Sequence, residues 1–161
     1  MAAVDYFLKL DGIDGESTDD KHKSEIDVES WSWGATQTGT FGGGGGGGAG
    51  KVQFQDFHFV TRVSKATPKL FLSCATGEHI KSAILTARKS GEQQQEFYKV
   101  TFSDVLISSY QSGGSGGDVI PTDQVSFNFA KIEVLYTPQR ADGAADSPVK
   151  AGYDVKANKK V

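Results

Sequence analysis

The sequence predicts a mainly β domain, either a small closed β-barrel or a curled two-sheet sandwich, with one short flanking helix over about residues 67–77. Two observations lead to this prediction. Apolar and polar residues alternate with a period of two in several runs, as they do in half-buried strands. The phase of the alternation changes within three of these runs, which is typical of bulges that bend and close a sheet. At 161 residues the chain fits one domain, expected to span 1–161.

The expected strands follow from this alternation, beginning with residues 4–10, which end at a Gly-containing turn. In the next run, from Ile26 to Trp33, apolar residues move from even to odd positions, which predicts a bulge near Ser30. The same slip occurs within the runs at 52–59 and 125–136. Further strands are expected at 82–89, 96–110 and 153–156.

One helix interrupts the strands. Thr67 is a good N-cap residue, Pro68 suits the first helical position, and Gly77 suits the end. The expected apolar stripe consists of Leu70, Phe71, Cys74 and Ala75. Residues 112–117 predict a flexible connection between two long strands, and the last twenty or so residues are expected on the surface.

A glycine run between Phe41 and Lys51 is almost free of side chains. Such a segment cannot build a core, so it points to assembly rather than catalysis. Its spacing also matches a phosphate-binding loop, but Val52 and a strand pattern follow where Ser or Thr and a helix are required. We expect the hairpin at 35–50 to contact a neighbouring subunit or ring, through Thr38, Thr40, Phe41, Gly42, Gly45, Gly48, Gly50 and Lys51.

Composition excludes several classes of protein. The formal charge of −3 and the pI of about 5.6 argue against a surface for nucleic acid or an anionic membrane. Cys74 is the single cysteine, which suits folding in a reducing cytoplasm. The first residues carry charges where a signal peptide needs an apolar stretch, so export without a cleaved signal is expected.

No constellation of residues predicts catalysis, a cofactor or a metal. The three histidines, His22, His58 and His79, have no partners at ligand spacing, and His58 is expected to be structural, on the strand face opposite Phe57 and Phe59. No serine lies in a nucleophile-elbow motif. The acidic residues of the first loop do not fit a calcium site and are interpreted as solvated turn residues: Asp11, Asp14, Glu16, Asp19 and Asp20.

Trp31 and Trp33 lie two residues apart, so in a strand they share one face and Ser32 takes the other. Paired tryptophans on a strand more often fill a core or an interface, and this is our expectation. A sugar-stacking platform is the alternative, which would make the chain a secreted carbohydrate-binding β-sandwich. A hydrolase without a recognised motif is a further competing hypothesis.

Several blocks together resemble one family, the haemolysin co-regulated proteins, which form the tube of bacterial type VI secretion. The similarity runs in family order from about Val4 to the C-terminus, and its specificity lies in the combination of a tryptophan block with glycine blocks. These blocks are Glu-Ile-Asp-Val-Glu-Ser-Trp-Ser-Trp-Gly at 25–34, Gly-Gly-Ala-Gly-Lys at 47–51, Thr-Pro-Lys-Leu at 67–70, Ser-Gly-Gly-Ser-Gly-Gly at 112–117 and Asn-Phe-Ala-Lys at 128–131.

The resemblance implies a small β-barrel similar to phage tail tube proteins, with six copies closing into a homo-oligomeric ring and rings stacking into a hollow tube. It implies no active site. It also implies assembly in the bacterial cytoplasm inside contractile sheath proteins, then secretion with a spike protein of the valine-glycine repeat family and with effectors. Neither nucleic acid nor membrane is an expected partner. In such a ring we expect Ser32 to face the lumen. Because the sequence stops at Val161, a version fused to a toxin domain is not expected.

Overall fold

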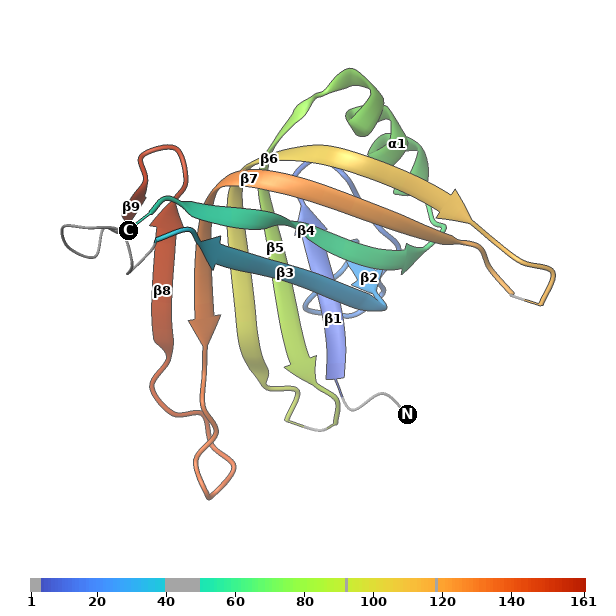
Figure 1. Cartoon of the computed structure of the whole chain (residues 1–161). Helices are drawn as coiled ribbons and strands as arrows, with labels where there is room; N and C mark the ends of the chain where they lie inside the picture. Colours follow the sequence, from blue (N-terminus) through green and yellow to red (C-terminus); the bar gives the residue numbers. More distant parts are fainter. Residues whose placement is uncertain (1–3, 40–49, 92, 118) are drawn as a thin grey trace.

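The computed structural model describes residues 4–39, 50–91, 93–117 and 119–161, and these form an antiparallel β structure with one helix (Figure 1). The predicted mainly β class is therefore confirmed. Within the described residues the elements are β1 Val4–Leu10, β2 Ile26–Val28, β3 Ser30–Gln37, β4 Val52–Arg62, α1 Thr67–Thr76, β5 His79–Lys89, β6 Glu96–Gly113, β7 Thr122–Tyr136, β8 Val149–Asp154 and β9 Lys159–Lys160.

The strands pair in the order β2-β1-β5-β6-β7-β4-β3, with β8 also on β7 and β9 on β8. Strands β6 and β7 bend. Through this bend they connect the strands that run down the view, such as β1, β5 and β8, to the strands that run across it, β3 and β4 (Figure 1). We call the first layer β2, β1, β5, the N-terminal half of β6, the C-terminal half of β7, β8 and β9. The second layer is the C-terminal half of β6, the N-terminal half of β7, β4 and β3.

The bend in β7 explains one predicted phase change. Residues 122–127 pair with β4, whereas residues 131–136 pair with β8 on the same edge. In β6, Asp104 lies close to this bend and has a positive φ of 53°. The predicted slip in β4 is also present, because the β3–β4 register shifts between Ser32 and Gly34, where β4 carries one extra residue.

The prediction of a bulge near Ser30 is wrong. Instead, β2 ends at Val28 and β3 starts at Ser30, and these two strands lie at opposite ends of the strand order. The apolar face changes because the chain passes from one layer to the other at Glu29. Alternation alone cannot distinguish such a crossing from a bulge, since both shift the phase by one residue.

The sheet comes close to a barrel without closing into one. Two hydrogen bonds join the β2–β3 junction to β4: Glu29 N donates to Val60 O at 2.8 Å, and Thr61 Oγ1 donates to Asp27 O at 2.7 Å. No ladder of paired residues joins β2 to β4 in the described part of the chain. The predicted closed barrel is thus replaced by two crossing layers that contact at this corner.

The core fills the space between the layers. Phe57, Phe102 and Phe127 are fully buried, with ring centroids 4.9 to 5.0 Å apart. Phe59 and Leu85 are buried with them. Burial of an aromatic side chain stabilises the fold by about 1.5 to 3 kcal/mol, so this cluster is a large share of the folding free energy.

Helix α1 covers the second layer at β6 and differs in detail from the prediction. Thr67 is its first residue, and the N-cap is Ala66, which makes no side-chain cap. The Thr67 hydroxyl instead donates to Asp123 at 2.5 Å. Gly77 ends the helix with φ 70°, as predicted. Of the predicted apolar stripe, Leu70 is buried and Cys74 is half-buried, whereas Phe71 is 56 % exposed and Ala75 is exposed, so the stripe is wrong for these two. Ser73 is buried instead, and Leu72 is 54 % exposed.

The C-terminal strand begins earlier than predicted. β8 starts at Val149 rather than at 153, and β9 was not expected. Val149, Lys150 and Ala151 are all exposed, so this half of β8 lacks the apolar alternation from which strands were predicted. The last residues lie largely on the surface, as expected.

Candidate functional site

The outer face of the second layer is a polar surface built from four strands. Cross-strand pairing aligns Ser32 of β3, His58 of β4, Ser126 of β7 and Ser109 of β6 in one row. Ser32 and Ser109 are exposed, and the His58 ring lies 2.9 Å from the Ser126 hydroxyl through its Nδ1. His58 thus lies on the face opposite Phe57 and Phe59, with a local polar partner.

Hydroxyl and amide groups dominate this polar face. The neighbouring row along the strands is Ser30, Val60, Gln124 and Gln111. The charged groups here are already paired: Asp56 accepts a hydrogen bond from Ser108, and Arg62 lies 2.9 Å from Glu29. A face of this kind offers hydrogen-bond donors and acceptors rather than net charge.

Trp31 and Trp33 lie on the opposite side of β3, against the core. Both are half-buried. The Trp31 ring stacks near Phe57 and Tyr98, with centroids 6.2 and 5.7 Å away, and meets the edge of Tyr6 at 5.8 Å. The indole is therefore engaged by rings of the protein itself, which does not favour its use as a sugar platform.

The second layer has a free edge on each side. Within the described residues, β3 stands at one end of the strand order and pairs only with β4. On the other side, β6 pairs with β5 as far as Leu106, and beyond Ile107 its partner among the described strands is β7 alone. Unpaired strand edges present rows of N–H and C=O groups that can pair with another chain.

The described part of the expected contact hairpin consists of Thr38, Gly50 and Lys51 with their neighbours. Thr38 Oγ1 donates to Lys51 O at 3.2 Å, which joins the two arms. A Cβ atom at Gly50 would lie 2.5 to 2.7 Å from atoms of Thr38 and Gly39, so glycine is required there. The remaining predicted hairpin residues, Thr40, Phe41, Gly42, Gly45 and Gly48, lie outside the described residues.

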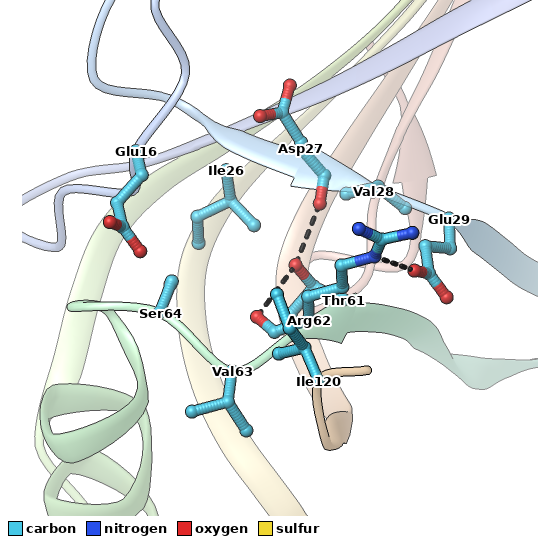
Figure 2. A pocket seen from close by; sticks show the side chains of 10 residues that line it. All are labelled: Glu16, Ile26, Asp27, Val28, Glu29, Thr61, Arg62, Val63, Ser64 and Ile120. Carbon is cyan, nitrogen blue, oxygen red and sulfur yellow. Dashed lines mark hydrogen bonds and ion pairs between the residues drawn. The ribbon is translucent and has the colours of Figure 1, made fainter. Parts of the chain in front are cut away.

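A pocket of about 430 Å³ lies where β2 approaches β4 (Figure 2). Its apolar lining is Ile26, Val28, Val63 and Ile120. Figure 2 shows the Asp27 carboxylate turned away from Val63 and Ile120, and Glu29 held by Arg62. The carboxylates around this pocket therefore do not converge as an acid–base pair would need to.

Residues 11–25 cover a second, polar buried layer on the outer face of the first layer, which the sequence did not reveal. Arg88 of β5 is only 3 % exposed and binds Asp19 through two hydrogen bonds of 2.9 and 2.6 Å. These hydrogen bonds are the main reason that the pKa of Asp19 is lowered to about 2. The interpretation of the loop acids as solvated turn residues is therefore wrong for Asp19.

His22 completes this buried layer. Its ring stacks on Phe7 with centroids 4.3 Å apart, and Arg88 lies 4.9 Å from the same Phe7 ring. The two ring nitrogens of His22 lie 2.9 Å from Glu25 and 2.6 Å from Glu96. Sequence spacing could not find these contacts, because Arg88 and Asp19 are 69 residues apart and His22 and Glu96 are 74 apart.

The described residues offer neither a metal site nor a membrane-spanning helix. Among the described residues, no group of three or more His, Cys, Asp or Glu side chains could hold a metal ion. In the same part of the chain, no helix is both long and apolar enough to span a membrane.

Comparison with known proteins gives consistent matches. Residues 7–136 match a family model described as type VI secretion system effector, Hcp. Protein hcp1 of Pseudomonas aeruginosa is 52 % identical over 158 residues, covering 97 % of this chain and 98 % of that protein.

Solved structures agree with these sequence matches. Hcp1 from Salmonella typhimurium has a TM-score of 0.83 and 40 % identity, and the match covers 99 % of this chain and 100 % of that one. A structure described as a type six secretion system protein has a TM-score of 0.92 and 31 % identity, with coverage of 99 % and 100 %.

Proposed function

Because this chain belongs to the Hcp family of type VI secretion proteins, we propose that it is the subunit of a secretion tube, in which six copies close into a ring and rings stack. The family consists of secreted structural tube proteins rather than enzymes. The observation that carries the proposal is the second layer, a four-stranded sheet with two free edges and one polar face.

The two edges are compatible with head-to-tail assembly. Strand directions alternate across the second layer, so β3 and the C-terminal half of β6 run antiparallel to each other. If the β6 edge of one copy pairs with the β3 edge of the next, the antiparallel order continues without interruption. Such a contact is heterologous, and repeated around an axis it closes a ring in which neither edge of the second layer stays unpaired.

The polar face then takes the inner surface of the ring. The other face of the second layer carries Phe57, Phe59 and Phe127 and is committed to the core of its own subunit. The hydroxyl and amide face, with Ser32 near its β3 edge, is left to line the lumen and to contact secreted effectors. Trp31 and Trp33 act as core residues beside the edge contact.

The other proposed partners follow from the family. Rings stack through their open ends, and the hairpin that includes Thr38, Gly50 and Lys51 contacts a neighbouring subunit or ring. The tube assembles in the bacterial cytoplasm within contractile sheath proteins, is tipped by a spike protein of the valine-glycine repeat family, and leaves the cell without a cleaved signal peptide. The single domain 1–161 is the repeating unit.

Native mass spectrometry tests the ring directly. The expected species has six times the 17.2 kDa mass of the chain. Ser32→Gln should leave this mass unchanged, because the side chain projects from the polar face, and should alter effector retention. A protein that stays monomeric at micromolar concentration, with no rings in electron micrographs, would contradict the proposal.

Cysteine pairs test the edge contact. In a Cys74→Ala background, we expect Ser32→Cys combined with Ser109→Cys or Gln111→Cys to form disulfides between subunits, because these exposed positions share the polar face near opposite edges. Lys9→Cys combined with Ser109→Cys is the matched control, since Lys9 is exposed on the first layer. Cross-linking of the control pair but of neither edge pair would refute the edge contact.

A further inference from the structure

Helix α1 presents a surface that its own subunit does not cover. Phe71 and Leu72 are each more than half exposed, although both are large and apolar. Lys69 is exposed three residues before Leu72, which makes the two side chains neighbours on the helix, and Lys65 is exposed just before the helix begins. Within the described residues neither lysine forms an ion pair. An apolar patch bordered by unpaired positive charge is typical of an interaction surface.

A surface of opposite character lies at the corner of β1 and β2. A pocket of about 440 Å³ there is lined by four apolar residues, Val4, Tyr6, Phe7 and Val28, and by the acidic residues Asp5, Asp27 and Glu29. Arg62 balances Glu29 at 2.9 Å, and Arg88 lies 3.6 Å from Asp5.

Asp27 is the unbalanced charge of this corner. In the described part of the chain its carboxylate has no ion-pair partner, and Figure 2 shows it turned away from Val63 and Ile120. Partial burial, and then the negative charges of Asp5 and Asp19, raise the pKa of Asp27 above its ordinary value. A cation brought to this corner would therefore relieve a repulsion that the subunit alone leaves in place.

The two surfaces border the two free edges of the second layer. Phe71 of α1 lies 6.0 Å from Tyr110 on the C-terminal half of β6. The acidic corner adjoins β3, because Glu29 directly precedes that strand and the Tyr6 ring lies 5.8 Å from Trp31. Trp31 and Tyr110 belong to one cross-strand row facing the core, so α1 and the Tyr6 side of the corner lie on the same side of the second layer. Asp27 pairs across the ladder with Phe7, on the other face of β1 and β2.

We propose that helix α1 of one copy docks into the acidic corner of β1 and β2 of the next copy, with Lys69 and Lys65 against Asp27 and its neighbours and Phe71 and Leu72 over the apolar lining. This docking rests on the ring proposed above, and it adds a second contact beside the strand pairing. Opposite charges on the two surfaces select the correct neighbour and set the head-to-tail direction.

Charge exchange tests the docking. We expect Lys69→Glu and Asp27→Lys each to raise the dissociation constant of the ring by about ten-fold or more, and the two combined to restore it to within about three-fold of the wild type. Lys160→Glu reverses an equally exposed lysine at the C-terminus and should leave the constant unchanged. Mass photometry over a dilution series measures these constants.

A second pair of variants separates docking from folding. Phe71→Ser should weaken the ring while leaving the melting temperature of dissociated subunits unchanged, because the side chain is 56 % exposed in the subunit. Asp27→Asn should weaken the ring without lowering that melting temperature, since its ionised carboxylate is disfavoured in the folded subunit.

The outcomes distinguish the two proposals. The docking would be overturned if the wild type forms rings, the double charge exchange does not restore the dissociation constant, and Phe71→Ser rings are as stable as wild-type rings. That result would leave the tube function standing. A wild-type protein that forms no ring would overturn the tube function itself, together with the docking.

Discussion

Two buried regions of this subunit are built on different principles. The core between the layers is apolar and rests on aromatic packing, with Phe57, Phe102 and Phe127 in mutual contact. The layer beneath residues 11–25 is polar and rests on directed contacts, with Arg88 on Asp19 and with both His22 and Arg88 against the Phe7 ring. The first holds the two layers together, and the second holds a loop on the outside.

The two regions should tolerate substitution differently. Apolar packing is non-directional and its loss scales with the volume removed. A buried ion pair has costly desolvation, so removing one partner is worse than removing both. We therefore expect the apolar core and the polar layer to lose different amounts of stability on substitution.

The largest effect is expected in the apolar core. Phe57→Ala should destabilise the subunit by about 3 to 5 kcal/mol, because the fully buried ring leaves a cavity. Phe71→Ala is the matched control, since its ring is 56 % exposed, and it should have little effect. Denaturant unfolding of dissociated subunits measures both, and equal losses for the two variants would contradict the assigned core.

A smaller effect is expected in the polar layer. Asp19→Asn should cost about 3 kcal/mol, because Arg88 then stays buried without its bidentate partner. Asp19→Asn combined with Arg88→Met removes the buried charge as well and should recover part of the loss. If the double variant is less stable than Asp19→Asn alone, the loss does not come from leaving the Arg88 charge buried without a partner.

The smallest effect is the acid sensitivity of the same pair. The pKa of Asp19 is lowered from 3.8 to about 2 in the folded subunit, so its contribution is fully present above the unfolded value and is lost as the pH falls through about 2. Unfolding free energies should therefore decline between roughly pH 4 and pH 2. Asp19→Asn should flatten this part of the curve, and an unchanged slope in that variant would assign the acid sensitivity to other groups.

The contrast also explains what could be predicted from sequence. Alternation predicted the strands that bury Phe57, Phe59 and Phe127, because period-two burial is a local property of a strand. It could not predict the break at Glu29, where the chain leaves one layer for the other, or the exposed start of β8 at Val149. Arg88 and Asp19 meet only once the sheet has formed, so no local pattern records their contact.

The same holds for the candidate site. The family resemblance led to the expectation of a ring, and alternation separated Ser32 from Trp31 and Trp33. The free edges of β3 and β6 could not be predicted, because the alternation in a sequence identifies a strand but does not say which strands pair with it. They follow only from the strand order. The lumen position of Ser32 stays a prediction.

Hydrogen exchange tests whether subunits join through the two free edges of the second layer. Exchange is compared in assembled rings and in subunits dissociated by dilution. Edge pairing predicts that amides of β3, residues 30–37, and of the end of β6, residues 107–113, become strongly protected on assembly, whereas those of β5 at the centre of the first layer are protected in both states. Rings that form while β3 and the end of β6 exchange as fast as in free subunits would contradict it.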